Sequence, residues 1–215
     1  MADFIYLTGC DGTGKSTQAR LLIEKFQNRG VNVQHLWLRF PFFTCIPLLM
    51  FARWRGYSWY ENANGFRHGY WDFRESPLLR NYLPWCLLLD AALAAIRKIY
   101  LPLKAGRLII CERFVIDMII DLSIACNDIN LFRRYPGKLF LYLLPPKSKI
   151  FVLDLNVPSI RDRRPDLRTD KRLEDRSIAY KHLARELSLT TFSSNDEMLE
   201  LHQQILARIQ TPFQE

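Results

Sequence analysis

The chain has 215 residues, of which 49% are hydrophobic and 24% are charged. This balance excludes a disordered or low-complexity chain, and the length fits one domain, or at most two small ones, with a well-filled core. Lysine and arginine number 30 against 22 acidic residues, which gives a net charge of +8. Such a surplus predicts an anionic partner: nucleotide phosphate, nucleic acid or an acidic membrane surface.

The cysteines and the apolar stretches indicate in which cellular compartment the protein is expected. The five cysteines are widely spaced and form no Cys-x-x-Cys pair, which excludes a zinc ribbon and disfavours a disulfide framework. The longest uncharged apolar stretch, residues 40–52, contains two prolines and is too short to span a bilayer. No basic cluster precedes the first apolar run, so we expect no signal peptide. These features predict a cytoplasmic protein without a transmembrane segment.

The first predicted elements form a βαβ unit. Residues 4–7 read as a strand, and a helical pattern begins at about residue 15 after a glycine-rich turn. Apolar residues then recur at the spacing of one helix face, at Ala19, Leu22, Ile23 and Phe26. The pair Arg29-Gly30 is a typical helix end, and residues 31–38 read as a second strand. A strand, a helix and a strand in this order predict a parallel sheet.

The alternation resumes in the second half of the chain. The predicted elements are, in order, a helix over 87–103, an apolar strand over 108–111, a helix over 114–126, a strand over 150–153, a charged helical stretch, a weak strand near 189–192 and a helix from about 195 to 209. A fully apolar strand is typical of the centre of a parallel sheet. The predicted fold class is therefore α/β with a doubly wound parallel sheet.

The segment 42–85 does not follow the alternation. It has no clean hydrophobic period, and it is crowded with aromatic rings and arginines: Trp54, Tyr57, Trp59, Tyr60, Phe66, Tyr70, Trp71 and Phe73, with Arg53, Arg55, Arg67 and Arg74. We interpret it as an aromatic-rich elaboration on the fold.

The decisive motif is a glycine-rich loop between the first strand and the first helix. Its sequence matches G-x-x-x-x-G-K-[ST], the pattern of a phosphate-binding loop, as Gly9-Cys10-Asp11-Gly12-Thr13-Gly14-Lys15-Ser16. Glycines let successive backbone N–H groups point at a phosphate, and the helix start adds its positive dipole end. We expect Lys15 to reach the β- and γ-phosphates and Ser16 to bind Mg²⁺. The predicted cofactors are therefore ATP and Mg²⁺, bound by residues from Gly9 to Thr17.

The rest of the chain narrows the kind of phosphate-loop protein. A GTP-switch protein carries an Asn-Lys-x-Asp motif, which this sequence lacks, and a large motor ATPase needs a longer chain. A small kinase fits this length. Such an enzyme must stabilise a transition state with heavy negative charge, so it depends on positioning and on cationic side chains.

Beyond the loop, several short motifs make the sequence resemble the thymidylate kinase family of nucleoside monophosphate kinases. Asp11 matches the family's Gly-x-Asp-Gly pattern, and residues 15–18 match its helix start. The likeness continues in Arg39-Phe40-Pro41, in Cys111-Glu112-Arg113-Phe114, in Leu153-Asp154-Leu155 with Arg163, Arg172 and Glu174, and in Ser193-Ser194-Asn195. It covers most of residues 3–41, 87–125, 145–182 and 189–210, and leaves 42–85 unmatched.

The resemblance implies a P-loop NTPase fold, a single kinase domain over 1–215, and phosphoryl transfer from ATP to dTMP. It implies as catalytic residues Lys15, Arg113, Asp11, Arg163 and Arg172. It also implies an arginine-bearing lid over about 159–176, for which a solvated, charged helix face is the alternative. Position 12 is glycine where one group of the family has an arginine, so the transferred phosphoryl group needs a lid arginine instead.

The strand ends supply the candidate acceptor and metal residues. Arg113 leaves the carboxyl end of a strand, where ligands bind in an open α/β sheet, and an arginine there suits an acceptor phosphate. Glu112 beside it is a candidate to hold Mg²⁺ through water, together with Ser16. Arg39 and Phe40, at the end of the second strand, are predicted to contact the acceptor. A simple strand-end ion pair is the alternative for Glu112 and Arg113.

The acceptor side departs from the family. An aromatic ring and an arginine recognise thymine there, and counting back without gaps from Glu112 places them on Leu88 and Ala92, which cannot do so. Asp117 and Asp121 are four residues apart on an otherwise apolar helix, so they share a face and need partners. They either bind the acceptor's sugar or base, or pair with a nearby Arg or Lys. Segment 42–85 is either a replacement acceptor pocket or a hydrophobic flap or dimer surface.

Two other functions stay open. A deoxynucleoside kinase carries a Glu-Arg motif like Glu112-Arg113, but it needs a carboxylate base near the end of the second strand. That strand ends in Leu38-Arg39 without an acid, which favours an anionic acceptor. A kinase-like protein could instead bind ATP and dock on a membrane or partner through 42–85. We expect nucleotide substrates, no nucleic acid, and a homodimer as one candidate assembly.

Overall fold

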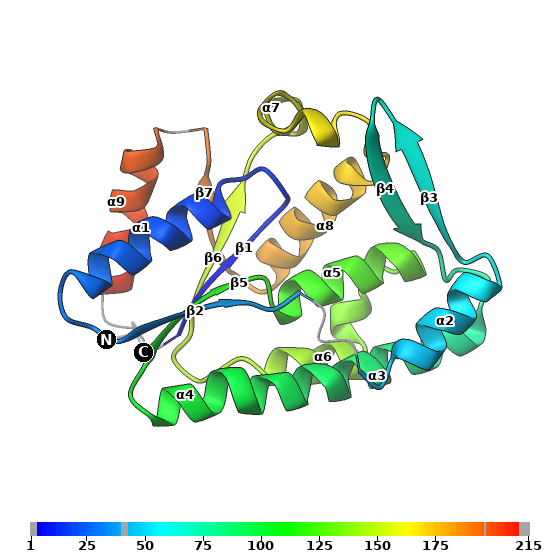
Figure 1. Cartoon of the computed structure of the whole chain (residues 1–215), viewed down its shortest axis with the longest axis horizontal. Coiled ribbons are helices and arrows are strands. Elements are labelled where there is room, and N and C mark those ends of the chain that lie inside the picture. Colours follow the sequence, from blue (N-terminus) through cyan, green and yellow to red (C-terminus); the bar gives the residue numbers. More distant parts are fainter. Residues whose placement is uncertain (1–3, 40–42, 196, 211–215) are drawn as a thin grey trace.

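The computed structural model describes residues 4–39, 43–195 and 197–210. Its centre is a five-stranded parallel sheet in the order β2-β5-β1-β6-β7 (Figure 1). The strands are β1 Phe4–Thr8, β2 Val33–Trp37, β5 Leu108–Glu112, β6 Lys149–Asp154 and β7 Thr190–Ser193. The prediction of an α/β fold with a parallel sheet is confirmed, and the arrangement is consistent with a P-loop kinase fold.

Helices cover both faces of the sheet. The helices α1 Lys15–Gln27 and α9 Met198–Gln210 pack on one face, and the other face carries α3 Pro77–Ala95, α5 Val115–Cys126, α6 Tyr135–Tyr142 and α8 Leu173–Glu186. Successive side chains of β1 point to opposite faces, so Phe4 and Tyr6 enter one core and Ile5 and Leu7 the other. This double burial explains why the central strands are apolar runs rather than alternating ones.

The helix before β5 is longer than predicted. The sequence indicated 87–103, whereas α3 begins at Pro77 and continues through a π-helical turn, Ile96–Tyr100, into α4 Leu101–Lys104. Ser76 caps its start by accepting a hydrogen bond from the backbone N–H of Leu79 at 3.3 Å. Pro84 lies inside the helix, where a proline removes one helical donor. That proline and the surrounding rings masked the helical period. The short helix α6 was also not predicted.

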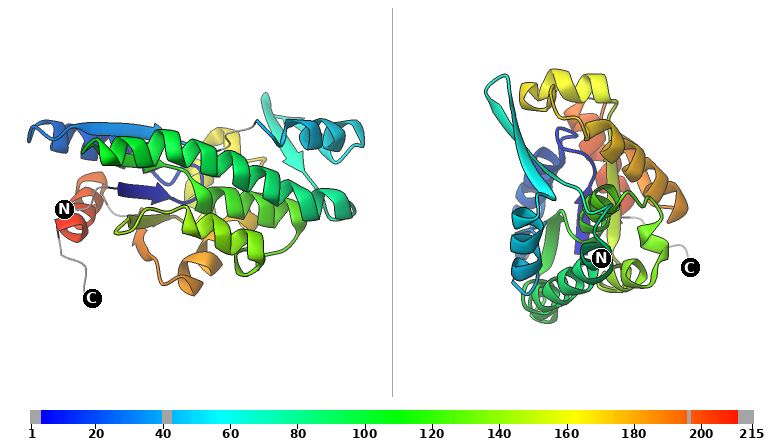
Figure 2. Two further views of the ribbon diagram at one scale, coloured as in Figure 1. Left: turned by 90° about the horizontal axis from the view of Figure 1, so that it is seen from below. Right: turned by 90° about the vertical axis from the view of Figure 1, so that its right-hand side faces the viewer.

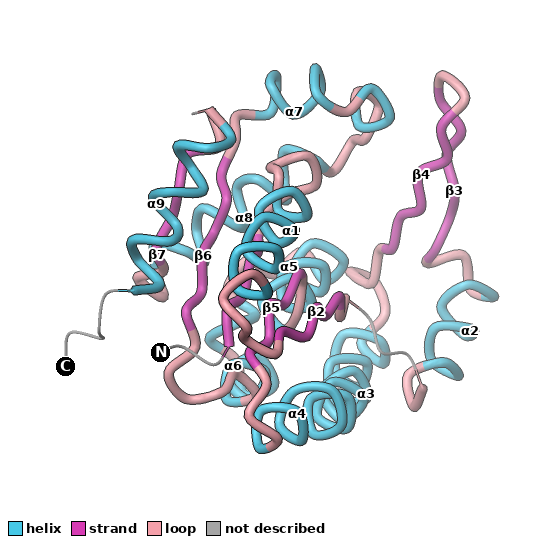
Figure 3. Tube along the Cα trace, turned by 60° about the vertical axis from the view of Figure 1, so that its left-hand side comes forward, coloured by secondary structure: helices cyan, strands magenta, loops and turns pink. Residues whose placement is uncertain are grey.

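Segment 42–85 has regular structure that its composition concealed. It contains α2 Ile46–Trp54 and an antiparallel hairpin of β3 Ser58–Ala63 and β4 Phe66–Trp71. Asn64 and Gly65 form the two-residue turn, both at positive φ, as an Asn-Gly hairpin requires. Figure 2 shows the hairpin projecting from the body of the molecule with α2 near its base, and Figure 3 shows it apart from the central sheet.

Two anchors attach this segment to the core. The Asp90 carboxylate of α3 accepts backbone N–H groups from Phe43 at 2.9 Å and Thr44 at 2.8 Å, at the start of α2. Beyond β4, the backbone N–H of Phe73 donates to the Ala125 carbonyl of α5 at 2.7 Å. The hairpin is therefore held beside α3 and α5.

Among the described residues, no helix is both long and apolar enough to cross a bilayer. All five cysteines are free thiols: Cys10, Cys45, Cys86, Cys111 and Cys126.

Candidate functional site

The glycine-rich loop, predicted to bind phosphate, connects β1 to α1, and its shape depends on its glycines. Gly9 has φ 137°, and a side-chain carbon there would lie 2.3 Å from the Leu153 carbonyl oxygen. Gly14, at the start of α1, has φ 86°. Only glycine adopts such φ values at low cost. The loop therefore takes a turn that a residue with a side chain at position 9 would not fit.

Lys15 is buried in the loop. Its Nζ donates a hydrogen bond to the Cys10 carbonyl at 2.5 Å. Burial lowers the pKa of Lys15 to about 8, although Asp117 and Glu112 act in the opposite direction. An anion bound in the loop would favour the charged form and raise this pKa.

Ser16 and Glu112 form the candidate metal position. The Ser16 hydroxyl donates to Glu112 Oε2 at 2.5 Å, and Glu112 Oε1 lies 2.7 Å from the His35 ring nitrogen of β2. Hydroxyl and carboxylate oxygens are ligands that Mg²⁺ accepts. In the described ranges no cluster of three or more His, Cys, Asp or Glu side chains could hold a metal ion. The Ser16 hydroxyl and the Glu112 carboxylate fit as two oxygen ligands of such a cation.

The strand register brings two arginines side by side. Leu7 of β1 and Trp37 of β2 both pair with Glu112 of β5, so the residues just beyond these strands meet at one edge. Arg113 has φ 63° and forms a close ion pair with Asp11 of the loop. Arg39 makes two hydrogen bonds to Asp121, at 2.9 and 3.1 Å, and lies 3.7 Å from Asp11. Phe40, predicted beside Arg39, lies outside the described residues.

Asp117 makes its contacts within the core. One oxygen accepts hydrogen bonds from the Tyr6 hydroxyl at 2.6 Å and the Thr8 hydroxyl at 3.0 Å, and the other from the Tyr180 hydroxyl at 2.6 Å. Its side chain is 0% exposed. Burial, and then the Asp117 charge, raise the pKa of Tyr6 and of Tyr180 well above the usual value. Asp117 is thus hydrogen-bonded within the core and also lies 3.7 Å from Arg113 Nη1, a pairing with a nearby arginine that the sequence left open. Its contact with a substrate stays a prediction.

The predicted lid arginines lie in different places. Arg163, at the end of α7 Val157–Arg163, donates to the Ser194 carbonyl at 2.9 Å and faces the loop. Arg172 instead donates to the Trp71 carbonyl of the hairpin. Arg164, which the sequence did not single out, also reaches the loop, because a side-chain carbon on Gly12 would lie 3.1 Å from Arg164 Cγ. The glycine at position 12 was the sequence feature that could have indicated this contact with Arg164.

The hairpin and the segment before α8 contact each other through polar groups. The Tyr70 hydroxyl accepts the backbone N–H of Lys171 at 3.2 Å, and His68 lies 3.0 Å from the Thr169 hydroxyl. Lys171 also pairs with Glu61 at 2.8 Å. These contacts join the predicted lid to β4 and fix the wall of a second cavity.

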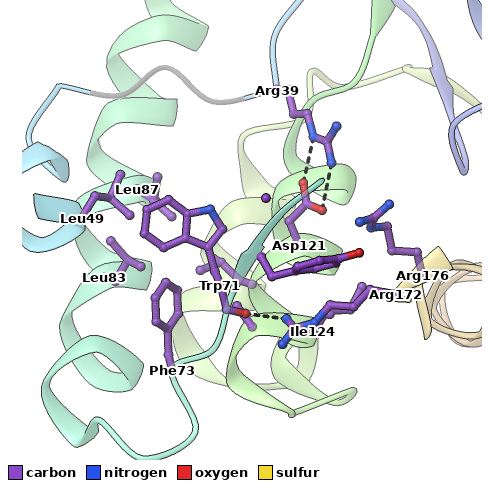
Figure 4. A pocket seen from close by; sticks show the side chains of 14 residues that line it. Arg39, Leu49, Trp71, Phe73, Leu83, Leu87, Asp121, Ile124, Arg172 and Arg176 are labelled. Atoms are coloured by element: carbon purple, nitrogen blue, oxygen red, sulfur yellow. Dashed lines mark hydrogen bonds and ion pairs between the residues drawn. The ribbon is translucent and has the colours of Figure 1, made fainter. Parts of the chain in front are cut away.

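Two cavities meet at this edge of the sheet. The first, of about 550 Å³, contains the loop and is called the donor cleft; its other walls include Trp37, Arg39, Arg113, Arg163, Arg164, Ser194 and Met198. The second, of about 240 Å³, lies between β4, α3, α5 and α8 and is called the inner pocket (Figure 4). Its walls are Arg39, Leu49, Gly69, Tyr70, Trp71, Phe73, Leu83, Leu87, Asp121, Leu122, Ile124, Ala125, Arg172 and Arg176. Arg39 lines both cavities.

Segment 42–85, which the sequence offered as one of two interpretations a replacement acceptor pocket, supplies six of the residues that line the inner pocket, but the sequence did not indicate which of its residues would do so. Counting without gaps indicated Leu88 and Ala92, but α3 contributes Leu83 and Leu87 instead. Trp71 and Phe73 come from the segment that had no clean period. No spacing rule connects these residues with Arg39 or Asp121, because they meet only after the chain has folded.

The comparisons with known proteins point to nucleotide kinases. No protein-family model matches the chain. A protein from Thermococcus kodakarensis named probable thymidylate kinase is 29% identical over 219 residues, which cover 97% of each chain. This distant relative suggests a nucleotide kinase.

Proposed function

We propose that this protein is a kinase that transfers the γ-phosphoryl group of ATP, with Mg²⁺, to a nucleoside monophosphate, with dTMP as the leading acceptor. The observation that carries the proposal is the position of Arg39, which lines both the donor cleft and the inner pocket. An acceptor phosphate bound by Arg39 would lie between the ATP in the donor cleft and the rest of the acceptor in the inner pocket. The name of the Thermococcus relative supports dTMP as the first acceptor to test.

On the donor side, the proposal assigns the triphosphate to the loop. Backbone N–H groups and the start of α1 bind the phosphates, and Lys15 neutralises the charge that develops on them. Ser16 and Glu112 would hold Mg²⁺, which supplies charge neutralisation between the β- and γ-phosphates. Arg163 and Arg164 approach the same cleft from the opposite wall and would stabilise the transferred group.

On the acceptor side, Arg39 and Arg113 would bind the phosphate that receives the group. Arginine presents two parallel donors to a phosphate, and a fixed pair of arginines positions the attacking oxygen. Asp11 and Asp121 hold these guanidinium groups in place. A phosphate oxygen is already anionic at neutral pH, so this reaction needs no general base.

One observation favours a second candidate, a deoxynucleoside kinase. The sequence offered no acid at the end of the second strand, yet Asp121 of α5 lies 2.9 Å from Arg39 Nε and borders the inner pocket. A carboxylate at that point could accept the proton of an attacking hydroxyl group. The acceptor would then be a nucleoside rather than its monophosphate.

The test is a screen of ADP release from ATP with each nucleoside monophosphate and each nucleoside as acceptor. We expect turnover with a monophosphate, and with dTMP above the others. Turnover with nucleosides alone would overturn the proposal in favour of the second candidate. A variant Lys25→Ala, on the exposed end of α1, serves as the matched control for changes in the loop.

The homodimer stays a prediction. The outward face of α3 exposes Tyr82, Trp85, Leu89 and Leu93, which is a surface that a second copy could cover. Light scattering during size exclusion gives the assembly state directly. A mass near the 25.4 kDa of one chain would contradict a dimer.

A further inference from the structure

We propose that the outward face of α3 and α4 binds the surface of a lipid bilayer that contains anionic lipids. This surface, called the α3 face, is a row of exposed apolar side chains accompanied by cations. Its apolar residues are Leu78, Tyr82, Trp85, Leu89, Leu93, Ile96 and Leu101. Most of the row lies beyond residue 85, outside the segment for which the sequence left membrane docking open.

The helix α3 and its continuation are apolar on two sides. The inward side, which includes Leu83, Leu87 and Ile99, is at most 2% exposed and packs in the core. The apolar residues of the α3 face are instead between 43% and 63% exposed. A helix at the surface of a soluble domain normally carries polar residues on its outward side. A contiguous apolar row on that side marks a surface that contacts a partner.

The row keeps to one side over the whole length of the helix. Steps of three and four residues lead from Leu78 to Ile96, which is the spacing of one α-helical face. The next step, from Ile96 to Leu101, is five residues and spans the π-helical turn, where residues five apart are hydrogen-bonded. At 1.5 Å per residue the row is roughly 35 Å long. Figure 2, in the view from below, shows α3, this turn and α4 as one continuous rod.

The charged residues of this helix are of one sign at the surface. The exposed cations within residues 77–107 are Arg80, Arg97, Lys98, Lys104 and Arg107. The one acid in that range is Asp90, which is 3% exposed and accepts backbone N–H groups at the start of α2. Lysine and arginine can lay their hydrocarbon stems on an apolar surface while their charged ends reach lipid phosphates. The α3 face therefore complements a surface that is both apolar and anionic.

Aromatic residues of the neighbouring helix α6 add to this chemistry. Tyr135 and Tyr142 are exposed at its two ends, and the ring of Tyr135 lies 6.1 Å from that of Trp85. The helix carries Lys138 and no acid. Tryptophan and tyrosine are enriched at the boundary between a bilayer and water, because their rings are apolar and their N–H or O–H groups are polar.

A second copy of the chain is the other occupant of this face, and charge argues against it. A symmetric dimer joins the same surface of both copies. The five cations of one helix would then face the five of the other, and neither helix has an exposed acid to pair with them. An anionic bilayer neutralises such cations and also covers the apolar row.

Docking on a bilayer would place the inner pocket close to the membrane. Leu83 and Leu87 line that pocket from the inward side of α3. The diameter of one helix, about 10–12 Å, separates this side from the α3 face. The candidate acceptor site would therefore lie just behind the membrane-bound helix.

The test measures binding of the full chain to large unilamellar vesicles by flotation. One preparation is phosphatidylcholine alone, and the other contains about 30% phosphatidylglycerol as the anionic lipid. We expect saturable binding to the anionic vesicles, binding at least about tenfold weaker to the neutral ones, and loss of most binding at about 0.5 M salt. No binding to anionic vesicles, or equal binding to both preparations, would overturn the proposal.

A variant with an acid inside the apolar row locates the contact. Leu89→Asp should weaken binding to anionic vesicles by at least about 30-fold, because it removes a buried leucine and adds a repelled charge. Ile178→Asp, on α8, is the matched control and should leave binding unchanged; the two wild-type side chains are 51% and 58% exposed. Circular dichroism shows whether each variant is folded, and Leu93→Asp replaces Leu89→Asp if it is not. Unchanged binding of the folded variant would contradict the proposal.

A second pair of variants tests the cations. Arg97→Gln combined with Lys98→Gln should weaken binding to anionic vesicles by about 10- to 30-fold and leave the weak binding to neutral vesicles unchanged. Lys25→Gln combined with Arg29→Gln removes two exposed cations at the end of α1 and should have no effect. An equal loss in both pairs would show that overall net charge, and not the α3 face, determines binding.

Light scattering of the wild type and of Leu89→Asp examines the other occupant. A wild-type dimer that Leu89→Asp converts to a monomer, together with no vesicle binding, would assign the α3 face to a second copy and overturn the proposal. Flotation is done without nucleotide, so its result does not depend on the proposed kinase activity. We expect wild-type protein on the anionic vesicles and Leu89→Asp in the unbound fraction.

Discussion

The donor cleft and the inner pocket lie next to each other, yet they are encoded in opposite ways. Half of the residues that line the donor cleft, from Asp11 to Gln18, form one continuous stretch, and its turn depends on glycines at fixed spacing. The inner pocket takes its walls from α2, β4, α3, α5 and α8. A turn that depends on glycines leaves a motif in the sequence, whereas a cavity lined by side chains from several elements leaves only composition.

The largest expected effect comes from a change in the loop of the donor cleft, which should leave the inner pocket unaffected. Lys15→Ala should reduce kcat by at least about 100-fold, because it removes a preorganised cation from the phosphates. Binding of acceptor probes to the inner pocket should stay within about threefold, since Lys15 does not line it. Turnover and calorimetry on one preparation measure both. Full activity in Lys15→Ala would refute the assignment of the donor cleft.

The next effect is expected at Arg113, which lines the donor cleft together with Arg39. Arg113→Ala should lower kcat/KM for the acceptor by at least about 100-fold, which corresponds to the loss of a charge-assisted contact of ~3 kcal/mol. Because Arg113 also neutralises Asp11, its removal leaves that carboxylate without its close partner. Arg133→Ala, at an exposed arginine paired with Glu186, is the matched control and should change neither constant. Unchanged acceptor kinetics in Arg113→Ala would place Arg113 outside the site.

A smaller effect follows from the low pKa of Lys15, which lies near 8 in the free protein because of burial. Bound phosphates raise this pKa, so binding takes up a proton when the solution is at or above pH 8. The association constant for ATP should therefore fall by up to about tenfold per pH unit above 8 and should not change through this group below pH 7. Calorimetry in buffers of different ionisation enthalpy counts the protons. Equal uptake at pH 6.5 and pH 8.5 would contradict the assignment.

The smallest expected effect distinguishes the two candidate acceptors. If Asp121 only holds Arg39, then Asp121→Asn should change kcat by less than about tenfold, because the amide keeps one acceptor oxygen. If Asp121 is a general base for a hydroxyl acceptor, the loss should be about 10²- to 10⁴-fold. Single-turnover kinetics with dTMP and with thymidine measures both cases. A large loss with dTMP would contradict our assignment of Asp121.

The same contrast between a continuous loop and an assembled pocket explains which features could be predicted from the sequence. The parallel sheet and the glycine-rich turn between β1 and α1 were predictable because alternating apolar segments and spaced glycines are local patterns. For the paired acids the sequence left two outcomes open, contact with the acceptor or a pair with a nearby Arg or Lys. Asp117 and Asp121 share one helix face, but Asp117 is enclosed by Tyr6 and Tyr180, whereas Asp121 reaches Arg39. Which partner each acid meets depends on strand register and on helix packing, and neither can be read from spacing.

The hairpin, too, could be predicted only in part from the sequence. Its Asn64-Gly65 turn is a strong local signal, but the aromatic residues on either side of that turn hid the strands. The position of Trp71 in the inner pocket depends on contacts between the hairpin and residues about one hundred positions later, such as the Tyr70 hydroxyl with Lys171. Long-range contacts of this kind have no counterpart in a single sequence.

The central claim is that a phosphoryl group passes from the donor cleft to the inner pocket across Arg39. The most direct measurement follows the label from ATP labelled on its γ-phosphate, with dTMP as acceptor and with Arg39→Ala beside the wild type. Our account predicts labelled dTDP from the wild type and at least about 100-fold less from Arg39→Ala. Label found only in inorganic phosphate, or equal labelled product from both proteins, would contradict it.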